Sequence, residues 1–331
     1  MGRVKSKEVA EALGVSTATV SLAINGKPGV NGETRQKIME YISRTQEQED
    51  SQIQKVKKII FVYSERMFSP EMQSIFKSSQ LEAVARLQRE GMEVVMAYAY
   101  GKEELREILE DSNSDGTKGM IVYADEFTDA EYEIMDLCKI PFVMLDCEMR
   151  QSEWNVAVFH NRMAVREGMR YLKARGCREV VYFKNSEQIY NFEMRRRAFL
   201  EFLKDDGEVR GEIFEVGKDL KSISTYVADF VAHREKLPDA IFLENYLVSI
   251  GTVGALEKLG IRIPEDISLI GIDGIPGTAI LPCRLTHFEA PHGRKGLISA
   301  EMLIEKMRNP QMEEGECRLI SMKFIKGDST S

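Results

Sequence analysis

Hydrophobic and polar positions follow two different periods, which divide the chain into a helical N-terminal segment and a mixed remainder. In the first 44 residues, apolar side chains recur three and four positions apart, which predicts three short helices. From Ile59 onward, short apolar runs alternate with amphipathic stretches. The apolar runs predict strands at 59–63, 93–98, 120–123, 142–145, 156–159, 180–183, 240–243 and 268–271. The amphipathic stretches predict helices at 71–90, 164–175, 193–204, 222–236, 248–259 and 293–307.

Strands that alternate with helices predict an α/β fold with parallel sheets, because each helix carries the chain back to the start of a parallel strand. A body of about 270 residues is more easily two lobes than one. In open parallel sheets, ligands bind beyond the carboxyl ends of the strands. The expected ligand site is therefore a cleft between two lobes.

The N-terminal segment has the pattern of a helix-turn-helix. Gly14 supplies a tight turn after the first helix, and Ser16 follows as the N-cap of the second. After a turn at 26–29, Asn31 is the expected N-cap of the third helix. The small core is expected to contain Val9, Ala10, Leu13, Val15, Val20, Ile24, Ile38 and Ile42.

The outer face of the second helix indicates DNA binding. It carries Thr17, Ala18, Ser21, Leu22 and Asn25. Helices of this kind enter the major groove, where hydroxyl groups donate to phosphates and other side chains meet base edges. Leu22 lies one turn from Ala18 and suits apolar contact with thymine methyl groups better than it suits guanine. The alternative is a three-helix bundle that mediates only protein contacts.

Charge is unevenly distributed along the chain, whose formal net charge is −8. Residues 1–58 hold ten Lys/Arg and seven Asp/Glu, whereas the remainder holds 35 basic and 46 acidic residues. Attraction to phosphates depends on local charge, so a basic head on an acidic body is compatible with DNA binding.

The sequence lacks the signals that are typical of other classes of protein. No apolar run reaches the roughly 18–20 residues of a membrane span, and the N-terminus has no secretory apolar region, so we expect a cytoplasmic protein. Five scattered cysteines and four dispersed histidines indicate neither a disulfide framework nor a zinc site. Nucleotide-binding glycine loops and the G-x-S-x-G elbow are absent, so we expect no enzyme, cofactor or metal.

Two sets of motifs point to one family. The head contains Val9-Ala10, Gly14-Val15-Ser16, Thr19-Val20-Ser21, Asn25 and Thr34-Arg35. The body contains Ile140-Pro141 with Leu145-Asp146, Arg195-x-x-Ala-Phe199, Ile241-Phe-Leu-Glu-Asn245, Pro264-Glu-Asp-Ile-Ser-Leu-Ile-Gly-Ile-Asp273 and Leu285-Thr286. Along nearly its whole length the chain thus resembles the lactose-repressor/galactose-repressor (LacI/GalR) family of transcription regulators.

The resemblance implies a periplasmic-binding-protein-like core of two Rossmann-like lobes, linked by three crossovers. It also implies a homodimer on a pseudo-palindromic operator, with an effector, a sugar or other small metabolite, held between the lobes. Repression is the family's common outcome, and we expect it here.

The resemblance further implies site residues. The expected DNA contacts are Lys5, Ser6, Ser16, Thr17, Ala18, Thr19, Ser21, Leu22, Asn25, Thr34 and Arg35. The expected effector contacts are Phe159, His160, Arg195, Asn245 and Asp273. The planar guanidinium of Arg195 suits hydroxyls or a carboxylate, while Asn245 and Asp273 follow strands and so face the cleft. Any one of them could instead be a solvated loop residue.

The expected domain division follows from these assignments. Residues 1–44 form the head, 45–58 a linker or degenerate hinge, and 59–331 the effector-binding and dimerisation body. Lobe 1 is expected at about 59–157 and 288–318, and lobe 2 at about 158–287 and 319–331.

The head departs from the family's pattern in two places. The family usually has arginine at the position of Leu22, so we expect a different operator. The family's hinge has Pro-Asn and a leucine wedge, whereas this chain has neither and carries Glu47, Glu49 and Asp50. We therefore expect no minor-groove insertion by a folded hinge, since burying an apolar wedge is what favours the kink.

The cleft also departs from the pattern. His160 precedes Asn161 where the family has aspartate, and Tyr246 and Gly274 replace two further aspartates. The lost carboxylates and added imidazole favour an acidic or aromatic effector, or none, over a neutral polyhydroxylated sugar. Without an effector, the body would serve for dimerisation and for docking a co-repressor protein. A solute-binding protein for uptake shares the lobes but needs export, and we expect no export here.

Overall fold

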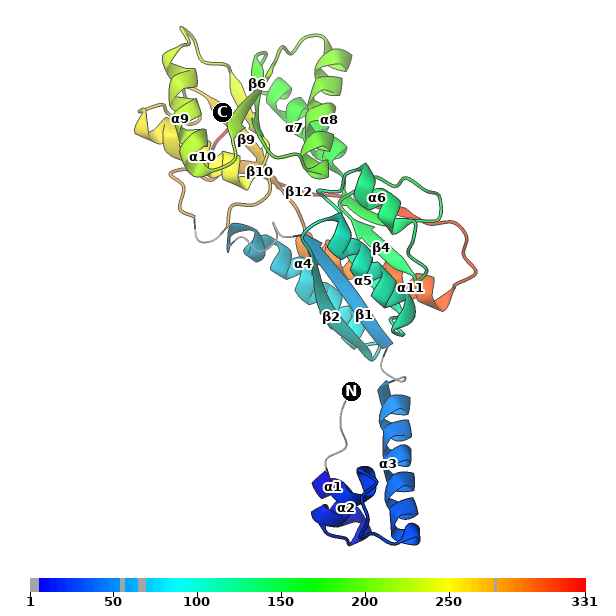
Figure 1. The fold of residues 1–331 in the computed structure, drawn as a ribbon. Coiled ribbons are helices and arrows are strands. Elements are labelled where there is room, and N and C mark those ends of the chain that lie inside the picture. Colours follow the sequence, from blue (N-terminus) through cyan, green and yellow to red (C-terminus); the bar gives the residue numbers. More distant parts are fainter. Residues whose placement is uncertain (1–5, 54–56, 65–69, 277–278) are drawn as a thin grey trace. The chain divides into compact units, whose positions relative to one another are not determined.

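The computed structural model describes residues 6–53, 57–64, 70–276 and 279–331, with side chains described at 9–42, 58–62, 76–276 and 279–331 (Figure 1). The chain forms two units. The smaller one contains the N-terminal helices, and the larger one contains two β-sheets with their helices.

The N-terminal unit contains the helices α1 (Ser6–Leu13), α2 (Thr17–Ile24) and α3 (Gly32–Ile53). Gly14 turns the chain between α1 and α2 with a φ of +64°, in the left-handed region that favours glycine. Ser16 caps α2, and its Oγ accepts from the backbone N–H of Thr19 at 3.1 Å. Asn31 caps α3 through a 2.7 Å bond from the N–H of Thr34. The predicted helix-turn-helix is therefore confirmed.

The core of this unit differs from the predicted one on α2. Val9, Val20 and Ile38 are buried as expected, whereas Ile24 is 47% exposed and the prediction for it is wrong. Ala23 takes the inner position, because it lies three residues after Val20 on the same face of the helix.

The third helix is longer than expected. It continues to Ile53 through most of the stretch that was predicted to be a linker. That stretch contains no proline or glycine and is rich in glutamine and glutamate, which favour helix. Residues 54–56 of the predicted linker lie outside the described residues.

The first sheet of the large unit, with its helices, is named lobe 1. Its strand order is β11-β5-β4-β3-β1-β2. The strands are β1 (Lys57–Ser64), β2 (Met92–Ala99), β3 (Gly119–Tyr123), β4 (Phe142–Leu145), β5 (Asn155–Phe159) and β11 (Cys317–Ile320). The pairs from β11 through β5, β4 and β3 to β1 are all parallel.

The second sheet, with its helices, is named lobe 2. Its strand order is β12-β10-β9-β8-β6-β7. The strands are β6 (Val180–Asn185), β7 (Ile213–Gly217), β8 (Ala240–Leu243), β9 (Ser268–Ile272), β10 (Thr286–Glu289) and β12 (Lys323–Ile325). Its pairs are parallel except for β10 with β12. The chain passes between the lobes after β5, after β10 and after β11.

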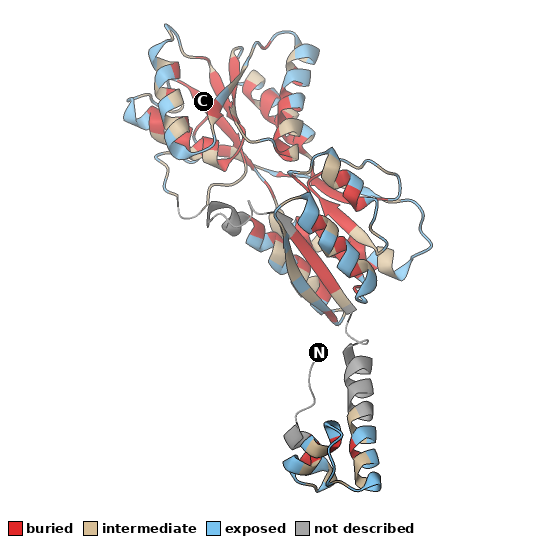
Figure 2. Cartoon of the chain, viewed as in Figure 1, coloured by how far each residue is buried: buried red, intermediate tan, exposed pale blue. Residues whose placement is uncertain are grey.

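Helices cover both sheets (Figure 1). In lobe 1, α4 (Pro70–Gln88) packs against α11 (His292–Arg308), and α5 (Lys102–Ser114) packs against α6 (Asp129–Met135). In lobe 2, α7 (Asn161–Ala174) packs against α8 (Tyr190–Asp206), and α9 (Leu220–Ala232) packs against α10 (Tyr246–Lys258). Buried residues run along the strands of both lobes (Figure 2). Among the described helices, none is long and apolar enough to cross a lipid bilayer.

The predicted parallel α/β architecture is confirmed, with all eight predicted strands and all six predicted body helices present. Four further strands, β7, β10, β11 and β12, and the helices α5 and α6 were not predicted. In β11 and β12 most residues are exposed or half-exposed, so these edge strands lack the apolar runs that reveal buried ones.

The contact between α4 and α11 depends on a glycine, which gives a test of the packing in lobe 1. A Cβ at Gly296 would lie 1.8 Å from the backbone oxygen of Ser79, so the two helices would have to separate. We expect Gly296→Ala to lower the free energy of unfolding of the full-length protein by about 1–3 kcal/mol in urea titration. Gly254→Ala is the control, because Gly254 has open space around it in α10, and it should leave stability unchanged or raise it. Equal effects of the two changes would contradict this packing.

Candidate functional site

The first candidate site is the outer face of α2 in the N-terminal unit. Thr17, Ala18 and Ser21 are exposed on this face, as expected. Leu22 differs from the expectation, because it is half-buried. Its Cδ1 lies 3.6 Å from the point where a Cβ on Gly29 would stand. The turn after α2 thus covers part of this leucine, and only the remainder is open to a partner.

Several of the other predicted DNA contacts are held by hydrogen bonds within the head. The Oγ1 of Thr19 lies 2.8 Å from the Oγ of Ser16, and Asn25 Nδ2 donates to the carbonyl of Ser21 at 2.8 Å. These bonds fix both ends of α2, so its outer face is a rigid surface.

The start of α3 carries the remaining predicted contacts. The Nη2 of Arg35 donates to the carbonyl of Lys27 at 2.5 Å, which ties α3 to the turn after α2. Thr34 is half-buried beside it. Lys5 and the side chain of Ser6 lie outside the described residues.

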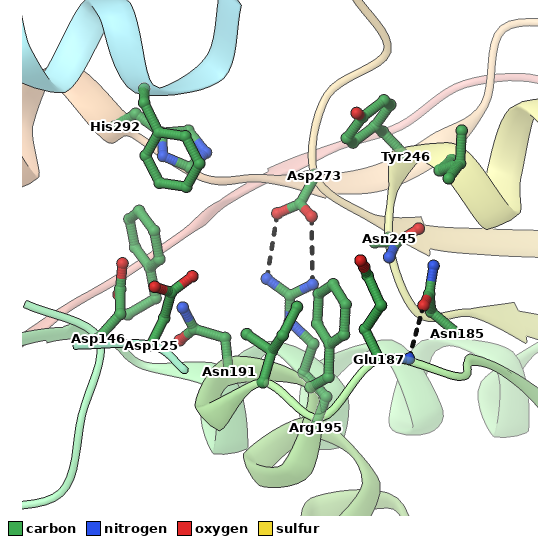
Figure 3. A pocket seen from close by; sticks show the side chains of 15 residues that line it. Asp125, Asp146, Asn185, Glu187, Asn191, Arg195, Asn245, Tyr246, Asp273 and His292 are labelled. Carbon is green, nitrogen blue, oxygen red and sulfur yellow. Dashed lines mark hydrogen bonds and ion pairs between the residues drawn. The ribbon is translucent and has the colours of Figure 1, made fainter. Parts of the chain in front are cut away.

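The second candidate site is a cavity lined by both lobes (Figure 3). It contains about 580 Å³ of space free of protein atoms, part of it open to solvent. Lobe 1 contributes Phe76, Asp125, Asp146, Phe159 and His292. Lobe 2 contributes Asn185, Glu187, Ile189, Asn191, Phe192, Arg195, Asn245, Tyr246, Leu247 and Asp273. Many of these residues follow directly on strands, so the cavity lies at the carboxyl ends of the sheets.

Arg195 is the centre of the hydrogen-bond network in the cavity wall. It is 2% exposed, and its Nη1 and Nη2 donate to the two carboxylate oxygens of Asp273, each at 3.1 Å. Its Nη1 also donates to the carbonyl of Glu244 at 2.7 Å, and its Nε donates to Asn161 Oδ1 at 2.9 Å. These bonds use four of the five guanidinium N–H groups, so Arg195 has one left for a ligand.

Two predicted effector contacts are N-caps. The Oδ1 of Asn245 accepts from the N–H of Val248 at 2.9 Å, which starts α10, and Asn245 also lines the cavity. His160 caps α7, with its Nδ1 3.4 Å from the N–H of Met163, and it does not line the cavity. Four of the five predicted residues, Phe159, Arg195, Asn245 and Asp273, thus lie together in the cavity wall. His160 is not among the residues that line the cavity, and its ring caps α7 instead.

The imidazole in the cavity wall belongs to His292. Its ring packs edge-on against Phe159, with 5.0 Å between ring centroids. Burial, together with the positive charges of Lys295 and Arg195, holds the pKa of His292 well below its usual range, so the ring is uncharged at neutral pH.

A buried ion pair supports the same wall. Lys295 is 0% exposed, and its Nζ donates to Oδ2 of Asp146. The ammonium also lies 4.3 Å from the ring centroid of Phe159. Lys295 belongs to α11, so this pair ties the wall of the cavity to the helix that packs against α4.

Two aspartates in the cavity wall have an unusual backbone conformation. Asp146 and Asp273 have φ values of 57° and 71°. Non-glycine residues adopt this left-handed conformation only when the surroundings fix it, and such residues cluster at functional sites. Each follows directly on a strand, β4 or β9, so the turn points its carboxylate across the strand ends.

Asn185 is fixed by a second buried ion pair. Arg196 Nε donates to Glu244 Oε1 at 2.7 Å, and Glu244 Oε2 accepts from the backbone N–H of Asn185 at 2.7 Å. The Oδ1 of Asn185 accepts from the N–H of Glu187 at 2.8 Å. Its Nδ2 is thereby assigned as the donor that remains.

Several cavity residues were not predicted from the sequence. Asp146, Asn185 and Asp125 end or follow β4, β6 and β3, so the rule that ligands bind beyond strand ends could have identified them. His292 and Phe76 are on α11 and α4, far along the chain from those strands, and nothing in the sequence connects them to the cavity. In the described part of the chain, no cluster of histidine, cysteine and carboxylate side chains could hold a metal ion.

The Arg195 network predicts a measurable loss of stability when the guanidinium is removed. We expect Arg195→Met to lower the free energy of unfolding by about 3–5 kcal/mol, because it leaves the largely enclosed carboxylate of Asp273, which is 13% exposed, without its counter-charge. Adding Asp273→Asn should recover part of that loss, and urea titration of both variants measures the coupling. Arg162→Met is the control, because the Arg162–Glu201 pair is exposed and should contribute under about 1 kcal/mol. Strictly additive losses would contradict the network.

Each of the two units matches a family model. Residues 6–45 match the model for bacterial regulatory proteins of the lacI family. Residues 169–330 match the model for a periplasmic binding protein-like domain.

Relatives match along the whole length of the chain. The HTH-type transcriptional repressor PurR of Erwinia tasmaniensis is 26% identical, over 93% of this chain and 91% of its own. PurR of Edwardsiella ictaluri is 25% identical, over 98% of this chain and 96% of its own.

Solved structures show the same fold. The lac repressor dimer bound to operator and the anti-inducer ONPF has a TM-score of 0.75 at 18% identity and covers 99% of both chains. A LacI-family regulator from Enterococcus faecium with bound ribose has a TM-score of 0.68 at 19% identity, over 83% of this chain and 99% of its own. With the head, the two lobes and full-length relatives all in agreement, the chain belongs to the LacI/GalR family of transcription regulators.

Proposed function

We propose that the chain is a sequence-specific DNA-binding transcription repressor. It binds a pseudo-palindromic operator as a homodimer, and a small-molecule effector in the cavity between the lobes modulates its affinity. The observation that carries this proposal is the capped helix α2, which presents Thr17, Ala18 and Ser21 outward above a small buried core. The proposed role is regulatory, and no catalytic step is assigned to any residue.

The outer face of α2 suits the major groove. Its exposed hydroxyls can donate to phosphates or to base edges, and Ala18 with the open part of Leu22 can contact thymine methyl groups. A dimer places two such helices on half-sites about one helical turn apart, so the preferred site should have two-fold symmetry.

The cavity supports the effector role. Its walls come from both lobes, so a ligand that contacts both can change how the lobes close. An effector shifts this equilibrium only through its different affinity for the two states. The cellobiose complex of the regulator CelR, which has a TM-score of 0.70 at 17% identity over 99% of this chain and 100% of its own, supports a small-molecule ligand by analogy.

The domain division remains part of the proposal. We assign about 59–157 and 288–318 to lobe 1 and about 158–287 and 319–331 to lobe 2, both within the effector-binding and dimerisation body. The exact crossings are adjusted by a few residues so that β5 and β11 stay whole in lobe 1 and β10 stays whole in lobe 2. Since α3 reaches Ile53, the connection to that body is shorter than the predicted linker.

Unbiased selection from random DNA duplexes tests the function. The purified full-length protein should enrich one sequence with two-fold symmetry. Enrichment of no sequence over the starting pool would refute sequence-specific binding.

Leu22 is the residue whose change should alter the selected sequence. We expect Leu22→Arg to change the preferred base at one position in each half-site towards guanine, with about tenfold or greater discrimination, because arginine pairs with guanine through two hydrogen bonds. Gln36→Arg is the control, since it adds the same charge at an exposed position on α3. It should raise affinity for all duplexes alike without changing the selected base. An unchanged base preference in the Leu22 variant would show that α2 does not read the groove at this position.

A further inference from the structure

We propose that Asp146, Asn185 and His292 contact the effector, and that the effector is an uncharged molecule with both hydrogen-bond donors and acceptors. The inference rests on the proposed effector role of the cavity and adds the chemical class of its ligand.

Three polar atoms in the cavity wall have no hydrogen-bond partner within the described part of the chain. They are Oδ1 of Asp146, Nδ2 of Asn185 and Nδ1 of His292, and all three atoms are buried. Asp146 is 2% exposed and Asn185 is 0% exposed, so bulk water does not satisfy them. Buried polar atoms without a partner are rare in folded proteins, and these three line the same cavity. A bound ligand that completes their hydrogen bonds accounts for all three.

The three atoms require different groups on the ligand. The Oδ1 of Asp146 is an acceptor and needs a ligand donor, because its other oxygen already accepts from Lys295. The Nδ2 of Asn185 is a donor and needs a ligand acceptor, because its Oδ1 is bonded to the N–H of Glu187. The neutral ring of His292 can pair with either kind of group. The ligand therefore carries donors and acceptors together.

The strongest charges around these atoms already have their counter-charges. Arg195 pairs with both carboxylate oxygens of Asp273, and Lys295 pairs with Asp146. An anionic ligand would lie beside the carboxylates of Asp146 and Asp273, and a cationic ligand would lie beside the guanidinium of Arg195 and the ammonium of Lys295. Either ligand would bring its charge close to an enclosed group of the same sign, which is unfavourable where little water screens the repulsion. This favours an uncharged ligand and departs from the acidic effector, which is one of the alternatives that the sequence leaves open beside an aromatic effector or none.

The positions of the three residues indicate that the ligand bridges the lobes. Asp146 and His292 belong to lobe 1, whereas Asn185 belongs to lobe 2. In Figure 3, Asp146 and His292 lie on one side of the Arg195–Asp273 pair and Asn185 on the other. Aromatic rings of Phe76, Phe159 and Phe192 also line the cavity, so the ligand has an apolar face as well.

A thermal-shift assay on the full-length protein tests the chemical class. The probes are matched sets that share one skeleton and differ in charge. They are glucose with glucose 6-phosphate and glucosamine, ribose with ribose 5-phosphate, and adenosine with adenosine monophosphate. Glucosamine is measured at mildly acidic pH, where its amine is protonated. We expect an uncharged member to raise the melting temperature and its charged partners to do so less or not at all. Greater stabilisation by a charged member, or none by any probe, would overturn the inference.

Variants at the cavity wall test the contacts. His292→Phe keeps a ring and removes Nδ1, and Asn185→Ser removes Nδ2 while keeping an oxygen for the N–H of Glu187. We expect each to weaken binding of the stabilising probe by about tenfold in isothermal titration calorimetry, because each leaves a ligand group unpaired. His292→Phe should not lower the melting temperature of the ligand-free protein, since the lost atom has no partner there.

Thr252→Val is the matched control. Thr252 Oγ1 is another buried atom without a partner in the described residues, but it lies outside the cavity wall. This variant should bind the probe as tightly as the unchanged protein. Equal weakening by Thr252→Val, or unchanged affinity in both cavity variants, would contradict the assigned contacts.

DNA selection on the same sample separates the proposed ligand class from the proposed repressor function. If a symmetric duplex is enriched and no probe binds, the ligand class is wrong and the DNA-binding role stands. If an uncharged probe binds with the expected loss in the variants and no duplex is enriched, the ligand class stands and the repressor function fails.

Discussion

The buried guanidinium of Arg195 is the interaction on which the ligand-facing end of lobe 2 depends. From α8 it reaches Asn161 at the start of α7, Glu244 after β8 and Asp273 after β9. A charge buried to this degree is stable only while its partners stay in place, so the ends of these elements have fixed relative positions. The cavity is built on this frame, and its polar wall is therefore preorganised before any ligand arrives.

Lobe 1 also has an ion pair in its part of the cavity wall, but there a carboxylate, and not a guanidinium, faces the cavity. There the buried charge is the carboxylate of Asp146, held by Lys295 from α11, which in turn packs against α4. One direct bond already joins the lobes next to the cavity, from the N–H of Tyr190 to the carbonyl of Asp125 at 2.9 Å. A ligand between two rigid walls can alter lobe closure without deforming either sheet. That is the physical basis on which an effector could influence the operator affinity of a dimer.

The sequence predicts the buried parts of this fold well and the exposed or long-range parts poorly. Apolar strand runs and helix caps such as Ser16 are local signals, and they led to the correct head, sheets and lobes. Leu22 was placed fully outside because its cover, the turn at Gly29, is a tertiary contact. His160 was placed in the cavity because its position along the chain does not reveal that its ring caps a helix. The ion pair of Lys295 with a residue far away in the chain has no local signal at all.

The proposed repressor combines a DNA-reading head and a ligand cavity in each chain of a dimer, and the mass of the protein–DNA complex reveals whether two chains bind together. Sedimentation equilibrium of the full-length protein with the duplex it selects gives the number of chains bound. We expect two chains on one symmetric duplex, and weaker binding, still by two chains, when half of that duplex is scrambled. A single chain on the intact symmetric duplex would contradict it.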